Sequence, residues 1–301
     1  QAESPKLAQH NDAISLNPKL FARVKAVYAQ RDRLTRPEQR QVIDIYYQDF
    51  IRAGAELSDA DKEKLRALNT RLSTLETAFQ QKLVAAAKAG ALVVDDKAKL
   101  AGLDADAIGA AAQAAKDRGL AGKWVLPLQN TTQQPSLGSL ADRATRQQLF
   151  GNSWTRAEKG DANDTRAIIA ELAELRAQKA ALLGYPNYAA YVLADQMAKT
   201  PEAAMRFMEQ LVPAIAAKQK SEVAEIQQVI TKDGESFALK PWHWDRYAEQ
   251  VRKAKYDLDQ DAVKPYFELD SVLRNGVLYA ATQLYGLTFK ERKDIPVYQP
   301  D

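Results

Sequence analysis

The side chains most often used for metal binding and nucleophilic catalysis are scarce in this sequence. Its 301 residues include two histidines, His10 and His243, and no cysteine. Enzymatic zinc sites usually need two or three imidazole or thiolate ligands, and these two imidazoles are far apart in the chain. The lack of cysteine also excludes disulfides and thiol nucleophiles. The sequence therefore predicts no zinc ligand set and leaves the redox compartment open.

Local catalytic motifs are also absent. Neither histidine begins a His-Glu-x-x-His pattern, in which two imidazoles one helical turn apart bind zinc and the glutamate activates water. There is no Gly-x-Ser-x-Gly nucleophile elbow, no Gly-x-Gly-x-x-Gly turn and no P-loop lysine. These motifs are continuous in sequence, so the corresponding sites are excluded from this chain.

An acidic run late in the chain partly matches a calcium-binding loop. Carboxylates occupy loop positions 1, 3, 5 and 12: Asp257, Asp259, Asp261 and Glu268. Position 6 is Ala262, where the sharp turn requires glycine, and Pro265 interrupts the segment before the expected helix. The pattern therefore favours a helix-capping acidic turn over a calcium site.

The densest aromatic segment is residues 241–247, PWHWDRY. Such a segment lines a groove for an extended peptide or, more often, packs two helices together. His243 is accordingly either a hydrogen-bonded core histidine or a substrate contact. Alone, it cannot form a catalytic metal site.

Composition and charge narrow the class of protein and its partners. Hydrophobic residues make up 46% of the chain, which excludes global disorder. Lys and Arg number 42 against 39 Asp and Glu, so the net charge of +3 predicts neither a nucleic-acid nor a membrane partner. No apolar stretch is long enough to span a bilayer, and the first residues lack a signal-peptide pattern.

Apolar spacing and the low glycine content predict a mostly α fold. The clearest helix covers residues 58–88, with leucines at steps of three and four, and another covers 37–51. We expect these two helices to form an antiparallel pair. Two short strands near residues 92–94 and 124–126 predict a small β-containing insertion within 91–137. Residues 130–138 are predicted to form a loop.

The second half of the chain also reads as helical. Caps and stops predict helices from residue 163 to 183 and from 201 to 233, the latter bent at Pro213. We expect helical segments at 247–255 and 265–284 to follow, and then a strand at 287–289. For the helix beginning at residue 201, the residues expected to face the core are Met205, Met208, Leu211, Val212, Ile215, Val223, Ile226 and Val229.

Two long segments of the chain have distinctive sequences, NSWTRAEKGDANDTR at 152–166 and ADQMAKTPEAA at 194–204. Shorter ones lie at 264–269, 272–273, 283–287 and 295–301. Together these segments resemble the peptidyl-dipeptidases, zinc metallopeptidases of the thimet oligopeptidase (M3) family. The similarity extends over essentially all 301 residues. Compared with the family, however, the chain looks like an interior piece that ends before the zinc-binding helix.

The resemblance implies one lobe of a helical ellipsoid split by a deep channel, with long antiparallel helices over 1–301. In the complete enzyme, zinc would lie at the channel floor and water would attack the penultimate peptide bond of a short peptide. This chain would supply scaffold and channel wall without catalytic or metal residues, and the missing catalytic lobe would be its partner. The candidates for the surface between the lobes are Trp242, Trp244, Tyr247, Tyr266 and Phe267.

Two alternatives accompany this interpretation. The chain could instead be a non-enzymatic helical scaffold that holds a peptide or a partner protein through the 241–247 cluster. The resemblance implies a cytoplasmic location, or a periplasmic one if a leader peptide precedes Gln1.

Overall fold

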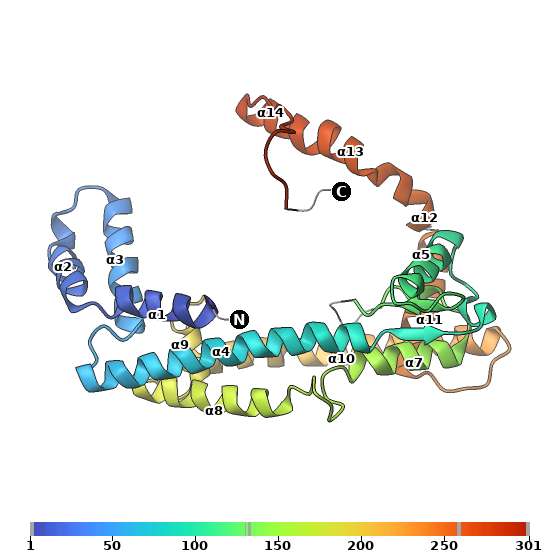
Figure 1. The fold of residues 1–301 in the computed structure, drawn as a ribbon, viewed down its shortest axis with the longest axis horizontal. Coiled ribbons are helices and arrows are strands. Elements are labelled where there is room, and N and C mark those ends of the chain that lie inside the picture. Colours follow the sequence, from blue (N-terminus) through green and yellow to red (C-terminus); the bar gives the residue numbers. More distant parts are fainter. Residues whose placement is uncertain (1–2, 130, 132–133, 258–259, 299–301) are drawn as a thin grey trace. The chain divides into compact units, whose positions relative to one another are not determined.

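The computed structural model describes residues 3–129, 131, 134–257 and 260–298. The chain divides into two compact units, Gln1–Tyr247 and Ala248–Asp301. Helices make up most of both units, and the described residues include only two short strands (Figure 1). The predicted fold class, mostly α with a small β insertion, is confirmed. Within the described part of the chain, no helix combines the length and apolar character needed to cross a membrane.

The first unit begins with four helices whose ends follow local sequence signals. Their bounds are Glu3–Ser15 for α1, Pro18–Tyr28 for α2, Pro37–Arg52 for α3 and Asp59–Ala89 for α4. The side chain of Ser58 accepts a hydrogen bond from the amide of Asp61 at 3.1 Å, which satisfies one free donor at the start of α4. Gly90 follows the last residue of α4. The two helices predicted over this region are therefore confirmed.

Helix α4 packs against α1 and α8 (Arg166–Leu182), and α4 and α8 lie side by side in Figure 1. Leu72 and Leu75 of α4 bury against Leu172 of α8. The expected antiparallel pair of α3 and α4 is wrong, because α3 packs against α2 instead. In that pair the rings of Phe21 and Phe50 stack at 5.9 Å, so each helix buries its apolar face against a different partner.

The predicted β insertion forms as a two-stranded antiparallel sheet. Strands β1 (Leu92–Val94) and β2 (Trp124–Leu126) pair with Val93 opposite Val125. Helix α5 (Ala105–Lys116) packs against β2. The inward side chains of the sheet join the largest core cluster, which also includes Leu100, Leu140 and Leu149.

The predicted loop at 130–138 is only partly described. Residues 130, 132 and 133 of this loop lie outside the described part of the chain. Its end instead enters a short helix, α6 (Ser136–Ser139), in which Leu137 is buried. A single helical turn is below the length at which sequence periodicity can be read.

Helix α10 (Pro201–Lys232) has the predicted ends and contains Pro213. The side chain of Thr200 caps its start, and Gly234 follows its end with φ +82°. Ile226 and Ile230 are buried, but the predicted core-facing role is wrong for the first half of the helix. Periodicity gives the residues that share a face without showing whether a neighbour covers it. Six of the side chains expected to face the core are 38–61% exposed: Met205, Met208, Leu211, Val212, Ile215 and, in the second half of the helix, Val223.

The second unit contains short helical segments after α11 (Trp244–Tyr256), a helix that begins in the first unit. They are α12 (Gln260–Val263), the 3-10 turn η4 (Lys264–Phe267), α13 (Leu269–Ser271), the π-helical segment η5 (Val272–Leu278) and α14 (Tyr279–Tyr285). Among residues 248–257 and 262–298, none is buried. The expected strand at 287–289 does not form, because no described segment pairs with it.

Candidate functional site

One wall of the site is the helix α7 (Arg143–Trp154). The side chain of Asp142 caps the start of this helix by accepting a hydrogen bond from the Thr145 amide at 2.7 Å. Phe150 and Trp154 are four residues apart and therefore share a face of the helix. Their rings stack with centroids 5.4 Å apart and planes 12° from parallel. Helix α7 thus presents a continuous aromatic surface.

The opposite wall comes from the second half of α10, where Gln219 and Val223 are also four residues apart. The chain then turns back, and the side chain of Gln227 fixes the returning segment. Its amide oxygen accepts from the Leu239 amide at 2.9 Å, and its nitrogen donates to the Phe237 carbonyl at 3.0 Å. These two bonds hold Leu239 beneath the space between α7 and α10.

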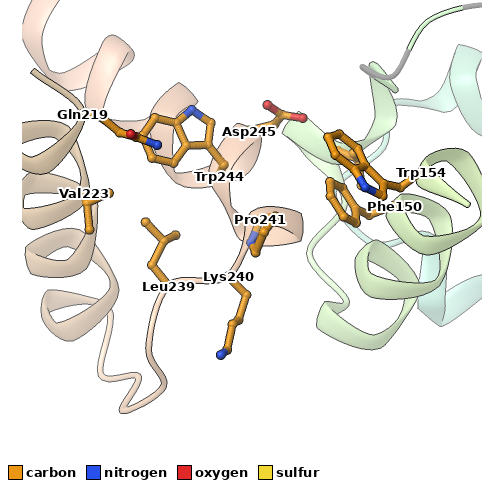
Figure 2. Close-up of a pocket in the computed structure, with 10 residues that line it drawn as sticks. Phe150, Trp154, Gln219, Val223, Leu239, Lys240, Pro241, Trp244 and Asp245 are labelled. Carbon is orange, nitrogen blue, oxygen red and sulfur yellow. The ribbon is translucent and has the colours of Figure 1, made fainter. Parts of the chain in front are cut away.

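The returning segment forms the floor of a pocket of about 560 Å³ (Figure 2). After Leu239, the chain passes through the 3-10 turn η3 (Pro241–His243) into α11, whose first residue is Trp244. The indole of Trp244 lies beside Gln219, and the stacked rings of α7 close the other side (Figure 2). Most of the lining is apolar, as in sites that bind organic ligands.

Asp245 is the acidic residue of this pocket. Its carboxylate lies between the indole of Trp244 and the stacked rings of Phe150 and Trp154 (Figure 2). Burial raises the pKa of Asp245 above its ordinary value of 3.8, because the charged form loses hydration. A carboxylate in such surroundings is stabilised by any positive charge that enters the pocket.

The structure brings together three of the five side chains predicted from the sequence. Trp244 lines the pocket, and Trp242 meets Phe150 with ring centroids 6.2 Å apart. Tyr247 is buried at 5% exposure, so it supports the turn from behind. The other two candidates, Tyr266 and Phe267, belong to the second unit and are 81% and 69% exposed within it.

Sequence reasoning missed the α7 wall, the polar residue Gln227 and the isolated carboxylate of Asp245. The spacing of Phe150 and Trp154 was an available signal, because two aromatic residues four apart on a helix form a stripe. Gln227 gave no signal, since its two hydrogen bonds join residues that are close only after α10 has turned back.

His243 is a core histidine. It is 3% exposed, and its ring lies 4.5 Å from that of Phe237 and at 90° to that of Tyr247. Its Nδ1 accepts a hydrogen bond from the Lys240 amide at 3.2 Å, while Nε2 is buried without a hydrogen-bond partner. Burial and nearby arginines, Arg146 foremost, lower the pKa of His243 to about 4. The imidazole is therefore neutral at physiological pH.

This burial predicts a specific loss of stability in acid. Between about pH 6.5 and pH 4, His243 is protonated in the unfolded state but remains neutral in the native state. The free energy of unfolding therefore decreases as the pH is lowered through this range. Relative to pH 7, the loss at pH 4.5 should be about 2 kcal/mol. His243→Asn keeps an acceptor for the Lys240 amide and should remove this part of the pH dependence in urea unfolding. His10→Asn, at an exposed position, is the control. Equal pH slopes in wild type and His243→Asn would contradict the assignment.

The structure offers no place for a metal among the described residues. They contain no group of three or more His, Asp or Glu that could hold an ion. In the candidate calcium loop, Asp259 lies outside the described residues. Glu268 instead caps α13, accepting from the amides of Asp270 at 3.1 Å and Ser271 at 2.7 Å. These bonds lower the pKa of Glu268, and they match the capping alternative predicted from the sequence.

Known proteins are similar to this chain over nearly its whole length. It is 54% identical over 299 residues to the dipeptidyl carboxypeptidase of Escherichia coli strain K12, covering 99% of this chain and 44% of that protein. The dipeptidyl carboxypeptidase of Salmonella typhimurium is 52% identical over 302 residues, again covering 44% of the relative. Oligopeptidase A of Escherichia coli is 28% identical over 267 residues, which are 87% of this chain and 39% of that protein.

The chain thus spans less than half the length of these relatives. Residues 136–301 match Peptidase family M3, and this region contains α7, α10 and the whole lining of the aromatic pocket. The match extends over more than half of the sequence. The chain therefore belongs to Peptidase family M3.

Proposed function

We propose that this chain is part of a zinc peptidyl-dipeptidase that releases dipeptides from the C-termini of short peptides. The observation that carries the proposal is the 54% identity, over 99% of the chain, to a protein named dipeptidyl carboxypeptidase. Identity to the oligopeptidase A of the same organism is 28%, so the first group is the nearer one. The chain would supply scaffold and part of the substrate-channel wall.

The aromatic pocket supports a role in binding peptides. It is open, largely apolar and fringed by a few polar groups, which suits side chains of an extended ligand. We place Trp242 and Trp244 near the peptide, with Tyr247 behind them. Tyr266 and Phe267 are proposed as further channel residues because both are aromatic and largely exposed in the second unit.

The proposed chemistry divides between this chain and the rest of the protein. Zinc, when bound, would polarise the scissile carbonyl and activate water. The described residues do not fit a zinc site, so the metal and the missing catalytic lobe are assigned to the remainder of the protein. The residues of this chain would bind and orient the peptide, which limits the entropy lost when the reacting groups meet. The proposed compartment is the cytoplasm, with the periplasm as the alternative.

The activity test compares the protein encoded by the whole reading frame with the 301-residue chain. Each would be incubated with an N-acetylated hexapeptide, and the products would be identified by mass spectrometry. The longer protein should release the C-terminal dipeptide and lose this activity with a chelator, whereas the shorter chain should release nothing. Release of single amino acids, internal cleavage, or no cleavage by the longer protein would contradict the proposal. Peptide binding without cleavage by both would instead favour the non-enzymatic scaffold.

A further inference from the structure

The aromatic pocket contains a carboxylate that no other group in the described part of the chain neutralises. Among the described residues, no hydrogen bond or ion pair reaches the side chain of Asp245, and desolvation is the cause of its raised pKa. Lys240 lines the same pocket, but its side chain extends away from this carboxylate (Figure 2). Partly buried charges are normally paired or hydrogen-bonded. A ligand with a positive charge could therefore supply the partner that the carboxylate of Asp245 lacks among the described residues.

The rings around Asp245 would bind the same kind of ligand. Phe150 and Trp154 stack into one continuous surface, and the indole of Trp244 lies across the pocket from them (Figure 2). The faces of aromatic rings carry negative potential and attract organic cations, with tryptophan the strongest. Together, a carboxylate and three aromatic rings form a site for a cation that is only weakly hydrated.

We propose that this pocket binds the side chain of an arginine in a peptide. A guanidinium is planar, so it can stack on an indole while donating two hydrogen bonds to one carboxylate. An ammonium is a compact and strongly hydrated charge, which makes lysine the poorer ligand. The aliphatic stem of arginine would pack on Val223 and Leu239, which line the same space. The inference rests on the proposed function in one respect, that the ligand is a peptide.

The size of the pocket agrees with such an occupant. Its volume of about 560 Å³ exceeds that of one arginine side chain and leaves room for part of the adjoining backbone. Trp154 is 62% exposed, so the aromatic wall is open at one side and the peptide main chain can remain outside. The pocket would thus hold one arginine side chain of an extended peptide at a time.

The test is calorimetric titration of the 301-residue chain with two blocked peptides, acetyl-Ala-Ala-Arg-Ala-amide and its citrulline counterpart. Citrulline has nearly the same shape as arginine but carries no charge. The arginine peptide should bind about tenfold more tightly than the citrulline peptide. Asp245→Asn should abolish this difference, and Trp154→Leu should reduce it several-fold. Asp233→Asn, at an exposed carboxylate outside the pocket, should leave it unchanged.

Equal affinity for the arginine and citrulline peptides in the wild-type chain would overturn the inference, and so would a preference that survives in Asp245→Asn. Circular dichroism of each variant checks that it is folded. Trp154 is mostly exposed, so its variant should fold even if Asp245→Asn does not. The readout is binding by this chain and needs no catalysis. If the pocket prefers arginine but the longer protein cleaves no peptide, only the proposed function is refuted. If the longer protein releases dipeptides but the pocket shows no preference for arginine, only the inference about the pocket is refuted.

Discussion

Replacing Gly102 by alanine is expected to cost about 3 kcal/mol or more of unfolding free energy. A Cβ at this position would lie 2.1 Å from the carbonyl oxygen of Ser139 and 3.0 Å from the amide nitrogen of Ala141. Both atoms are backbone, so neither can rotate away. The φ angle of Gly102 is +95°, a conformation that alanine rarely adopts, and this adds strain.

The cost should spread beyond the substituted residue. Segment 139–141 is held by the Ala141 amide, which donates to the Ala101 carbonyl at 2.7 Å. Arg246, next to the pocket carboxylate, donates to the Ser139 carbonyl at 3.0 Å. Moving segment 139–141 to relieve the clash would lengthen both of these hydrogen bonds. Because Arg246 belongs to the first turn of α11, the effect would extend to the start of that helix.

A second glycine separates the effect of the steric clash from that of the backbone strain. Gly119 also has a positive φ, +71°, but a Cβ there would meet nothing within 4 Å. Gly119→Ala should therefore cost only about 1 kcal/mol. Urea unfolding of both variants gives the comparison. A Gly102→Ala variant no less stable than Gly119→Ala would mean that segments 101–102 and 139–141 are not in contact.

The second large effect is expected for Leu149→Ala, at about 3 kcal/mol. Leu149 is 1% exposed and belongs to the main core cluster beneath the sheet. Truncation removes buried methyl groups and leaves a cavity, because packed neighbours relax only partly. Leu149 directly precedes Phe150 on α7, so the core side of this helix supports its aromatic side.

The measurement is again urea unfolding, with Val84→Ala of α4 as the control. Val84 is 69% exposed, and its truncation should change stability by less than about 0.5 kcal/mol. In the Leu149→Ala chain, affinity for the arginine peptide should also fall as α7 loses its support. Similar stabilities for the two variants would argue against a packed core under α7.

Local sequence signals predicted the ends of helices well. Ser58 and Gly90 bound α4, and Thr200 and Gly234 bound α10, because capping and termination depend on a few neighbouring residues. Choosing which helices pair was less successful. We expected α3 and α4 to pair, yet the leucines of α4 bury against α8, more than ninety residues further along.

The candidate site was predicted in part, for the same reason. The density of aromatic residues predicted segment 241–247 as a candidate site, and Trp242 and Trp244 do lie at the pocket. The facing wall comes from α7, about ninety residues earlier, and only packing in three dimensions brings it there. Exposure also escaped prediction, since the apolar first half of α10 has the same periodicity as a covered helix face.

The placement of the tryptophans has an optical consequence. The chain has four, and Trp154, Trp242 and Trp244 lie in or beside the aromatic pocket, while the fourth, Trp124, belongs to β2. Intrinsic emission of the first unit is therefore weighted towards one place on its surface. A charged ligand bound between these indoles would shift or quench that emission. Tryptophan fluorescence should therefore report ligand binding without an added label.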